Sequence, residues 1–489
     1  MSINHVDLYA AARQEMAAGG FHPEFSGEVR SQVTKVKAMV AQPHADKAVR
    51  DLRGLLWSSI DNDTSRDLDQ IEAAERLPNG GIRIMIGIAD VDALVAKGTP
   101  IDLHAQSETT TVYTGIVNFS MLPEELSTGL TSLNENADRL AVVVEIVLAS
   151  DASIQSSDAY RALVRNKAQL AYSGVGPWLE GKASPPSKVA DSGSLQDQLK
   201  VQDEAAQRMR TARYRMGALN IDSIETTAEL LNGQVSGIHV AQKNRASELI
   251  EDFMIGANGV IARMLADKHV SSIRRVVKTP ERWDRIVELA AKFGAHLPSE
   301  PDSGALNAFL LKRKAEDPVH SPDLSLAIVK LMGPGEYVVE RPGDPLQGHF
   351  GLAVHDYTHS TAPNRRFADL VTQRLVKAVL AGEPGPYSDA ELDAIAKNCT
   401  LKEDAARKVE RAMRKRIAAV ALSGRIGETF RAVVTGVTPK GTFVRTIDPP
   451  AEGLVVHGQQ GLDVGEQVHA KLVSTDPQRG YLDFSVSAR

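Results

Sequence analysis

Four carboxylates fall within nine residues in the segment Asp61-Asn62-Asp63-Thr64-Ser65-Arg66-Asp67-Leu68-Asp69. Side chains that repel one another are gathered in this way mainly where a cation neutralises them. Carboxylate oxygens are hard ligands, so Mg²⁺, Mn²⁺ or Ca²⁺ suits them better than zinc. Asp67 and Asp69 are two apart, so in an extended segment they project from one face and could share an ion. The segment predicts that Asp61, Asp67 and Asp69 converge on a divalent cation.

Two other interpretations of this segment remain open. Counted from Asp61, the oxygen-bearing side chains have the spacing of a calcium-binding EF-hand, with Glu72 at the twelfth position. That loop requires glycine where this chain has Arg66, and it requires a helix on each side, whereas residues 55–60 suit a strand. A solvated acidic turn is commoner for charge clusters, but it leaves the apolar neighbours Ile60 and Leu68 unexplained.

Composition limits the class of protein. The 489 residues are enough for about three domains of roughly 150 residues. The net charge is −6, so any basic surface that binds nucleic acid must be local. The one cysteine, Cys399, excludes a disulfide scaffold and a cysteine-rich zinc site, which fits a reducing cytoplasm. Residues 1–21 lack the features of a signal peptide and residues 140–149 are too short to span a bilayer, so we expect a cytoplasmic protein without a membrane segment.

The hydrophobic pattern predicts an α+β protein in three parts. Residues 1–45 read as a helical segment that could be winged-helix-like, because Leu8, Ala12 and Met16 recur at helical spacing. The large middle part, residues 46–420, mixes strands and helices. From Gly427 the chain changes to short strands with regular turns, which predicts a five-stranded OB-fold β-barrel in residues 421–489. The clearest elements of the middle part are strands at 83–88 and 140–148 and helices at 246–268 and 363–382.

A second motif, Tyr357-Thr358-His359-Ser360-Thr361-Ala362-Pro363-Asn364-Arg365-Arg366-Phe367-Ala368-Asp369-Leu370, enters the last of these helices. Thr361 can cap the helix and Pro363 suits its first turn. The free N–H groups of a helix start favour an anion, and an arginine adds a bidentate phosphate contact. The motif therefore predicts a phosphate site at Arg365 or Arg366. The alternative is a surface ion pair between one arginine and Asp369.

The two motifs together resemble the ribonuclease II (RNB) family of exoribonucleases. The family's Ser-Ile-Asp and Asp-Leu-Asp signature appears here as Ser59-Ile60-Asp61 and Asp67-Leu68-Asp69. Its Tyr-Thr-His-x-Thr-Ser-Pro-x-Arg-Arg-Tyr-Ala-Asp-Leu signature appears at residues 357–370, with Ala362 for serine and Phe367 for tyrosine. The resemblance covers about residues 50–420 in family order. It implies a large mixed RNB catalytic domain.

The resemblance also implies an activity and roles for particular residues. The expected protein is a hydrolytic 3′→5′ exoribonuclease that releases nucleoside 5′-monophosphates with Mg²⁺, which Mn²⁺ could replace. Its expected partner is single-stranded RNA, including RNA with structured regions, and we expect a monomer. The resemblance implies that Asp61, Asp67 and Asp69 bind the metal and that Arg365 binds the scissile phosphate. It implies that Tyr113 stacks on the terminal nucleotide and that Glu410 lies near the 3′ end of the RNA. His359 and Arg366 are implied to contact RNA. For Glu410 an i,i+4 pair with Arg414 is an equal alternative.

The chain departs from the family pattern in two places. Gln70 stands where the family usually has a fourth aspartate, and an amide is a weaker ligand for a hard dication. Gln70 therefore predicts an active enzyme whose dependence on the metal ion is altered. The alternative is a catalytically weak RNA-binding or regulatory protein on the same fold. Family members also commonly carry two small barrels before the catalytic domain, which the 45 helical residues here cannot encode. We therefore expect a more open entrance and better tolerance of duplex RNA.

The C-terminal part resembles an S1-type OB-fold, on the strand pattern of residues 427–437, 441–445, 453–457 and 482–485. Such barrels bind single strands by stacking bases on surface aromatics along a basic groove. We expect Phe430, Phe443 and His457 to stack on bases and Arg445 to contact phosphates. The alternative for Phe430 is a place in the barrel core.

Overall fold

A computed structural model describes residues 6–40, 48–221, 225–231, 234–241, 243–318, 320–345 and 347–486. The N-terminal part has helices α1 (Leu8–Ala18) and α2 (Gly27–Val40). Residues 6–40 contain no strand, so a winged-helix-like unit is not seen there. In α1 the apolar residues predicted to share a face, Leu8, Ala12 and Met16, are buried, and α1 packs on the long helix α12 (Asp389–Leu422).

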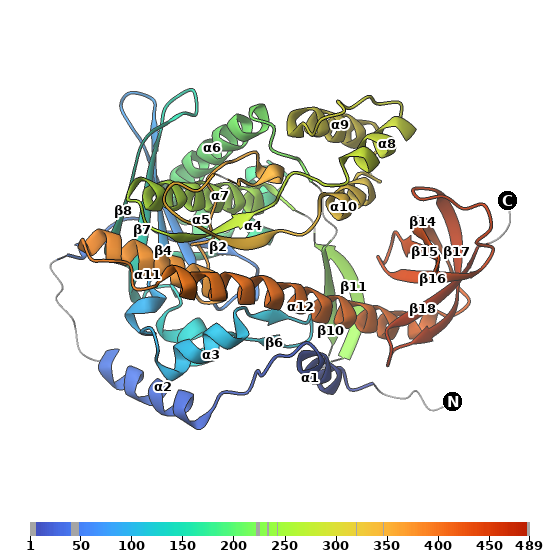
Figure 1. Cartoon of the computed structure of the whole chain (residues 1–489), viewed down its shortest axis with the longest axis horizontal. Coiled ribbons are helices and arrows are strands. Elements are labelled where there is room, and N and C mark those ends of the chain that lie inside the picture. The colour runs from blue at the N-terminus through green and yellow to red at the C-terminus, as the bar shows by residue number, and fades with distance from the viewer. Residues whose placement is uncertain are drawn as a thin grey trace.

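The middle part is built on a mixed seven-stranded sheet with the order β1-β8-β7-β4-β3-β2-β9. Its strands are β1 (Arg50–Asp51), β2 (Ser58–Asp61), β3 (Gln70–Arg76), β4 (Ile82–Ala89), β7 (Asp138–Leu148), β8 (Ile154–Arg165) and β9 (Ala168–Ala171). The predicted strands at 83–88 and 140–148 are confirmed as β4 and β7. Helices α6 (Gly193–Arg215) and α7 (Arg245–Asp267) pack on this sheet, and α7 confirms the predicted helix at 246–268. Figure 1 labels β2, β4, β7 and β8 of this sheet, near helices α6 and α7.

Smaller elements surround the sheet. They are α3 (Pro100–Glu108), β5 (Val112–Tyr113), β6 (Asn118–Phe119), α4 (Tyr172–Leu179), α5 (Ser187–Ala190), β10 (Glu225–Leu231), β11 (Gln234–Ala241), β12 (Ser272–Val276), α8 (Trp283–Lys292), α9 (Ser303–Glu316), α10 (Ser321–Met332), β13 (Glu336–Glu340) and α11 (Phe367–Ala381). Helices α8, α9 and α10 form a unit with its own apolar core around Trp283, Ile286, Phe309 and Ile328. Gly382 ends α11 with a left-handed backbone (φ 69°), which a residue with a Cβ adopts less readily.

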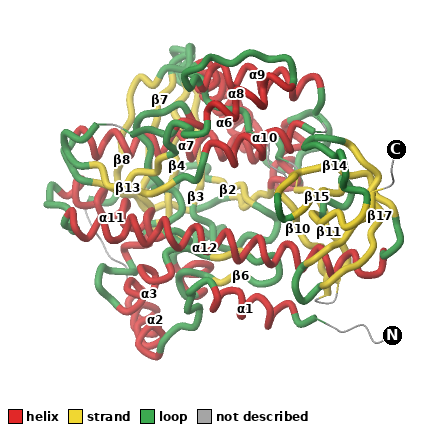
Figure 2. Tube along the Cα trace, turned by 45° about the vertical axis from the view of Figure 1, so that its right-hand side comes forward, coloured by secondary structure: helices red, strands yellow, loops and turns green. Residues whose placement is uncertain are grey.

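The long helix α12 connects the parts of the molecule. It has 34 residues, or about 51 Å, and contacts α1, β13, the β10–β11 hairpin and the C-terminal barrel. Figure 2 shows this helix crossing the molecule towards the barrel. It begins with a capping box made by Ser388 and Glu391. Because α12 passes the middle part before it reaches the barrel, one continuous helix carries residues of both.

The barrel is closed, with the order β14-β15-β16-β18-β17, as predicted. Its strands are β14 (Thr429–Thr438), β15 (Gly441–Thr446), β16 (Glu452–His457), β17 (Gln467–Asp476) and β18 (Tyr481–Val486). Its core includes Val434, Val444, Leu472 and Phe484, and it is continuous with the end of α12 at Leu422. In the described part of the chain, no helix is both long and apolar enough to cross a membrane.

Candidate active site

The acidic segment lies between strands β2 and β3, so it has a strand rather than a helix on each side. The EF-hand interpretation is therefore wrong. The backbone N–H of Asn62 (2.7 Å) and the hydroxyl of Ser65 (3.0 Å) both donate to Asp61 Oδ1, which curls the loop around this carboxylate. Asp63 is exposed and instead accepts the Ser173 hydroxyl at 2.7 Å.

Asp69 is the most buried carboxylate of the segment, at 2% exposed, which excludes a solvated acidic turn. Its Oδ1 accepts the backbone N–H of Asn364 at 2.9 Å. Its Oδ2 has no hydrogen-bond partner and lies 3.6 Å from Nε of Arg365, whose side chain is 42% exposed. Burial raises the pKa of Asp69 to about 7, although the Arg365 charge opposes this rise. A buried carboxylate thus faces a guanidinium that remains open to a ligand.

Tyr113 connects the acidic segment to α12. Its hydroxyl donates to Asp67 Oδ2 and its backbone N–H donates to Glu410 Oε1, both at 3.2 Å. Burial raises the pKa of the Tyr113 hydroxyl and of the Glu410 carboxyl. The structure therefore gathers Asp67, Asp69, Tyr113, Arg365 and Glu410 from four distant parts of the sequence.

The donor chemistry of this cluster fits a hard divalent cation. Burial raises the pKa of both Asp61 and Asp69, and the Asp67 charge adds to the rise, so the three carboxylates lie within one another's field. Among the residues that the structure describes, no group of three or more His, Cys, Asp or Glu is arranged to hold a metal ion. The unpartnered Oδ2 of Asp69 is directed at Arg365 instead. A shift of the Arg365 guanidinium towards a phosphate would free this oxygen.

The second motif differs from its prediction at the helix start. Helix α11 begins at Phe367, so Thr361 does not cap it and Pro363 is not in its first turn. The cause is Asp369, which reaches back to accept the Ala362 N–H at 2.8 Å and pairs with Arg366 through two contacts of 2.7 and 2.8 Å. The predicted helix-start roles of Thr361 and Pro363 are wrong, and Arg366 follows the ion-pair alternative, while the phosphate contact of Arg365 stays a prediction.

His359 lies in a cluster of aromatic rings with Tyr337 and Tyr357. Its Nδ1 is 2.8 Å from the Tyr337 hydroxyl, and its ring contacts the rings of Tyr337 and Tyr357. Burial lowers the pKa of His359 well below its usual value, and the Arg366 charge adds to this effect. The residue is half-buried and packs against both tyrosine rings, so it supports the loop of residues 357–366, and its contact with RNA stays a prediction.

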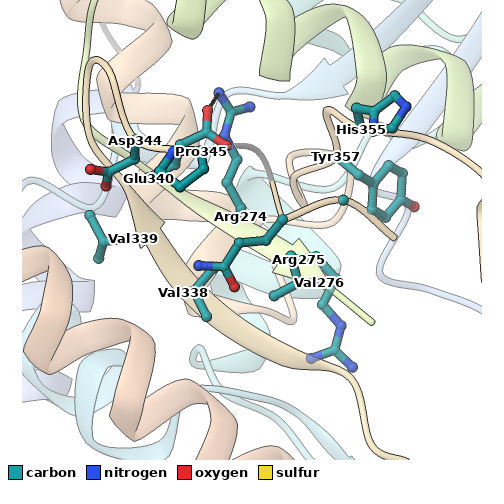
Figure 3. A pocket seen from close by; sticks show the side chains of 12 residues that line it. Arg274, Arg275, Val276, Val338, Val339, Glu340, Asp344, Pro345, His355 and Tyr357 are labelled. Atoms are coloured by element: carbon teal, nitrogen blue, oxygen red, sulfur yellow. Dashed lines mark hydrogen bonds and ion pairs between the residues drawn. The ribbon is translucent and has the colours of Figure 1, made fainter. Parts of the chain in front are cut away.

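A small cavity of about 10 Å³ lies behind Tyr357 (Figure 3). Arg274 and Arg275 line it from β12, and Arg274 donates to Glu340 at 2.7 Å across it. This volume holds about one water molecule. It is far too small for a nucleotide, so the cavity is not a binding site, and its lining residues pack against Tyr357 at the start of the second motif.

Two residues near Asp61 were not predicted as site residues. Tyr172 follows Ala171, the strand partner of Asp61, and burial raises its pKa, with the charges of Asp61 and Glu72 adding. Glu72 is fully buried, and neither of its carboxyl oxygens has a hydrogen-bond partner. Burial raises its pKa well above the usual value. The register of β2 with β9 and β3 places both residues here, and no local sequence signal reveals that register.

In the barrel, one of the four predicted RNA contacts is contradicted, and a second, Arg445, has a protein partner, so its phosphate contact stays a prediction. Phe430 is 4% exposed and lies in the core, because strand alternation turns it inward with Ala432. Arg445 is bound by Asp323 of α10 in a bidentate ion pair, so it is not a free phosphate ligand. Phe443 is half-buried on the outer face of β15 and His457 is exposed at the end of β16. Their stacking on bases stays a prediction.

Comparison with known proteins shows which family the chain resembles. Residues 49–382 match the RNB domain family, and residues 428–487 match the RNase II-type exonuclease C-terminal S1 domain. Ribonuclease R of Thermotoga maritima is 31% identical over 94% of this chain and 68% of its own length. The chain spans between 53% and 68% of the length of this and three similar curated relatives, including ribonuclease R of Escherichia coli.

Solved structures agree on the fold. Mycoplasma genitalium RNase R in complex with ribose methylated single-stranded RNA superposes with a TM-score of 0.88, covering 99% of this chain and 79% of that one at 23% identity. Yeast Ssd1, described as a pseudonuclease, superposes with a TM-score of 0.68 over 89% of this chain and 53% of that one, at 19% identity. At such identities the likeness establishes the fold alone.

Proposed function

Because the chain belongs to the RNB family of ribonuclease R/II-type 3′–5′ exoribonucleases, we propose that it hydrolyses RNA from the 3′ end to nucleoside 5′-monophosphates. The observation that carries the proposal is the pairing of Asp69 with Arg365. A buried carboxylate oxygen without a hydrogen-bond partner faces Arg365, whose side chain is 42% exposed, and the Tyr113 hydroxyl binds the neighbouring Asp67. A scissile phosphate has a cationic partner at this position.

The proposed cofactor is Mg²⁺, with Mn²⁺ able to replace it. Asp61, Asp67 and Asp69 would hold it, and when bound it would supply an activated water and neutralise phosphate charge. Arg365 binds the scissile phosphate and stabilises the charge that develops on it. Oδ2 of Asp69 has no hydrogen-bond partner, so it is the oxygen that this residue would offer to the cation.

Tyr113 and Glu410 position the 3′ end in this proposal. The Tyr113 ring is partly exposed, and hydrogen bonds at its hydroxyl and at its backbone N–H hold the residue in a position where the ring could stack on the terminal base. The proposed partner is single-stranded RNA that reaches the site by its 3′ end. The Mycoplasma relative is also known in complex with double-stranded RNA, which supports extending the partners to RNA with structured regions.

A second candidate function rests on Gln70. This residue is buried next to Asp69, where the family usually has an aspartate, and Ssd1 shows that the fold also exists as a pseudonuclease. The chain would then bind RNA with little or no turnover. Turnover of RNA by the wild-type chain separates the two candidates, and Gln70→Asp tests the role of this residue in an active enzyme. An active enzyme with altered metal demand changes its rate or Mg²⁺ dependence in this variant, and an unchanged rate and dependence would contradict that account.

The decisive assay follows a 5′-labelled single-stranded RNA with Mg²⁺, using wild type and Asp69→Asn. A shortening ladder with released 5′-monophosphates, lost in the variant, is the expected result. Asp63→Asn is the matched control, because Asp63 is in the same loop but turned to Ser173, and it should retain the ladder. RNA that is bound by wild type but stays intact would favour the second candidate.

A further inference from the structure

The barrel and the α8–α10 unit have separate apolar cores. The barrel core continues into the end of α12, whereas Trp283, Phe309 and Ile328 belong to the core of the α8–α10 unit. In Figure 1 the two stand next to each other at one end of the molecule. Contact between bodies with separate cores resembles a transient interface, and such bodies can move relative to one another.

Among the described residues, two ion pairs that differ in geometry and exposure connect these bodies. Arg445 of β15 contacts Asp323 of α10 with Nε–Oδ1 at 3.0 Å and Nη2 at 2.6 and 2.7 Å from the two carboxylate oxygens. These side chains are only 15% and 12% exposed. Lys292 of α8 and Asp463 of the barrel are 3.6 Å apart and 63% and 74% exposed. The first is a shielded bidentate contact, and the second is a screened surface pair of little strength.

The shielded pair lies on the face of the barrel that nucleic acids use. In OB-folds the face of the second and third strands binds oligonucleotides, and here these strands are β15 and β16. Thr442, Val444 and Thr446 are buried, so alternation puts Phe443 and Arg445 together on the outer face of β15. A strand of RNA stacked on Phe443 would therefore bring its phosphates next to Arg445.

We propose that the Arg445–Asp323 pair is a gate on the barrel's RNA-binding face, which opens when an RNA phosphate replaces Asp323 on the Arg445 guanidinium. The gate rests on the proposed function, because it requires RNA as the ligand. A phosphate and a carboxylate offer the same pair of oxygens to a guanidinium, so the exchange keeps the bidentate contact. In the closed state Asp323 competes with RNA, and the apparent affinity falls by the fraction of molecules that are open.

The test measures RNA affinity and the distance between the two bodies separately. Lys312→Cys on α9 and Arg479→Cys on the barrel accept a fluorescent donor and acceptor, because both positions are exposed and Cys399 is buried. Affinity for a single-stranded 20-nucleotide RNA is measured in EDTA over a range of salt concentrations. The variants are Asp323→Asn, Arg445→Gln, and the exchanged pair Asp323→Arg with Arg445→Asp. Asp463→Asn is the matched control, since it removes one aspartate from the same junction.

Each variant has a distinct expected result. Asp323→Asn should open the bodies without RNA and bind RNA about tenfold more tightly if the closed form dominates about ten to one. Arg445→Gln should also open them, but the slope of log affinity against log salt should be about one unit smaller than for Asp323→Asn, because one phosphate contact is lost. The exchanged pair should stay closed, and RNA should no longer open it. Asp463→Asn should behave as wild type.

Two results would overturn the gate. In the first, Asp323→Asn has the same RNA affinity and the same energy transfer between the two fluorescent labels as wild type. In the second, Asp463→Asn changes both quantities as much as Asp323→Asn does. Because RNA binding is measured in EDTA, where no divalent cation is available for hydrolysis, the test does not depend on whether the chain hydrolyses RNA. A wild-type chain that binds no RNA would overturn the gate and the proposed function together, whereas RNA binding without a response to Asp323→Asn overturns the gate alone.

Discussion

The candidate active site and the barrel junction each set an arginine against an aspartate, but the two contacts have different geometry. Arg365 approaches Asp69 by a single contact of 3.6 Å and is 42% exposed. Arg445 holds Asp323 through contacts of 2.6, 2.7 and 3.0 Å and is 15% exposed. A loosely held, open guanidinium can take a substrate phosphate directly, while a saturated one holds two elements together until a competing anion arrives.

The largest effect should come from the aspartate of the loose contact. Asp69→Asn keeps the shape and the Asn364 contact but removes the charge that faces Arg365 and the acidic cluster. We expect the single-turnover rate of RNA hydrolysis to fall by about 1,000-fold, since electrostatic groups at a reaction centre each contribute about 10²–10³. A quench-flow or gel time course measures it. An unchanged rate would remove Asp69 from the site.

The two aromatic residues of the barrel should separate stability from binding. Phe430→Ala opens a cavity in the core and should lower the free energy of unfolding by about 3–5 kcal/mol. Phe443→Ala, on the outer face, should leave thermal unfolding nearly unchanged and weaken RNA binding by about 1–3 kcal/mol. Calorimetry measures the free energy of unfolding, and fluorescence anisotropy measures the affinity for RNA. The same loss of stability in both variants would contradict the assignment of their faces.

A smaller effect is expected from pH. Burial raises the pKa of Asp69 from the usual 3.8 to about 7 in the folded chain, so the folded state holds the proton more tightly than the unfolded state. Its contribution to stability is full below pH 4 and is lost as the pH rises to 7, by roughly 2–4 kcal/mol in EDTA. Wild type should therefore lose stability relative to Asp69→Asn between pH 5 and 8. Parallel unfolding curves for the two proteins over this range would contradict the buried, unpaired state of Asp69.

The sequence predicts this molecule well where the information is local. The carboxylates of residues 61–69 and the strand alternation of β4 and β7 are patterns within one segment. The fold class, the family and the barrel were predictable for the same reason. Glu410 and Tyr113 came from the family resemblance, and the structure adds the contact that joins them, 297 residues apart in sequence.

The failures arise where a partner is remote or where two local signals compete. Asp323 is 122 residues from Arg445, so nothing in the barrel sequence shows that the arginine is occupied. Phe430 and Phe443 are both strand aromatics, and only the orientation of each strand decides which is in the core. The start of α11 was placed too early because Thr361 and Pro363 look like a cap, whereas Asp369 satisfies the preceding backbone instead.

The most direct test of the account compares Arg365→Gln with its neighbour Arg366→Gln, by single-turnover RNA hydrolysis and by thermal unfolding of the same samples. Arg365→Gln should lower the rate by about 100-fold or more while unfolding stays unchanged, because its guanidinium has one loose contact. Arg366→Gln should lose about 3–5 kcal/mol of stability, because it leaves the buried Asp369 without its partner. A wild-type rate in Arg365→Gln would contradict the proposed phosphate contact and the active site built around it.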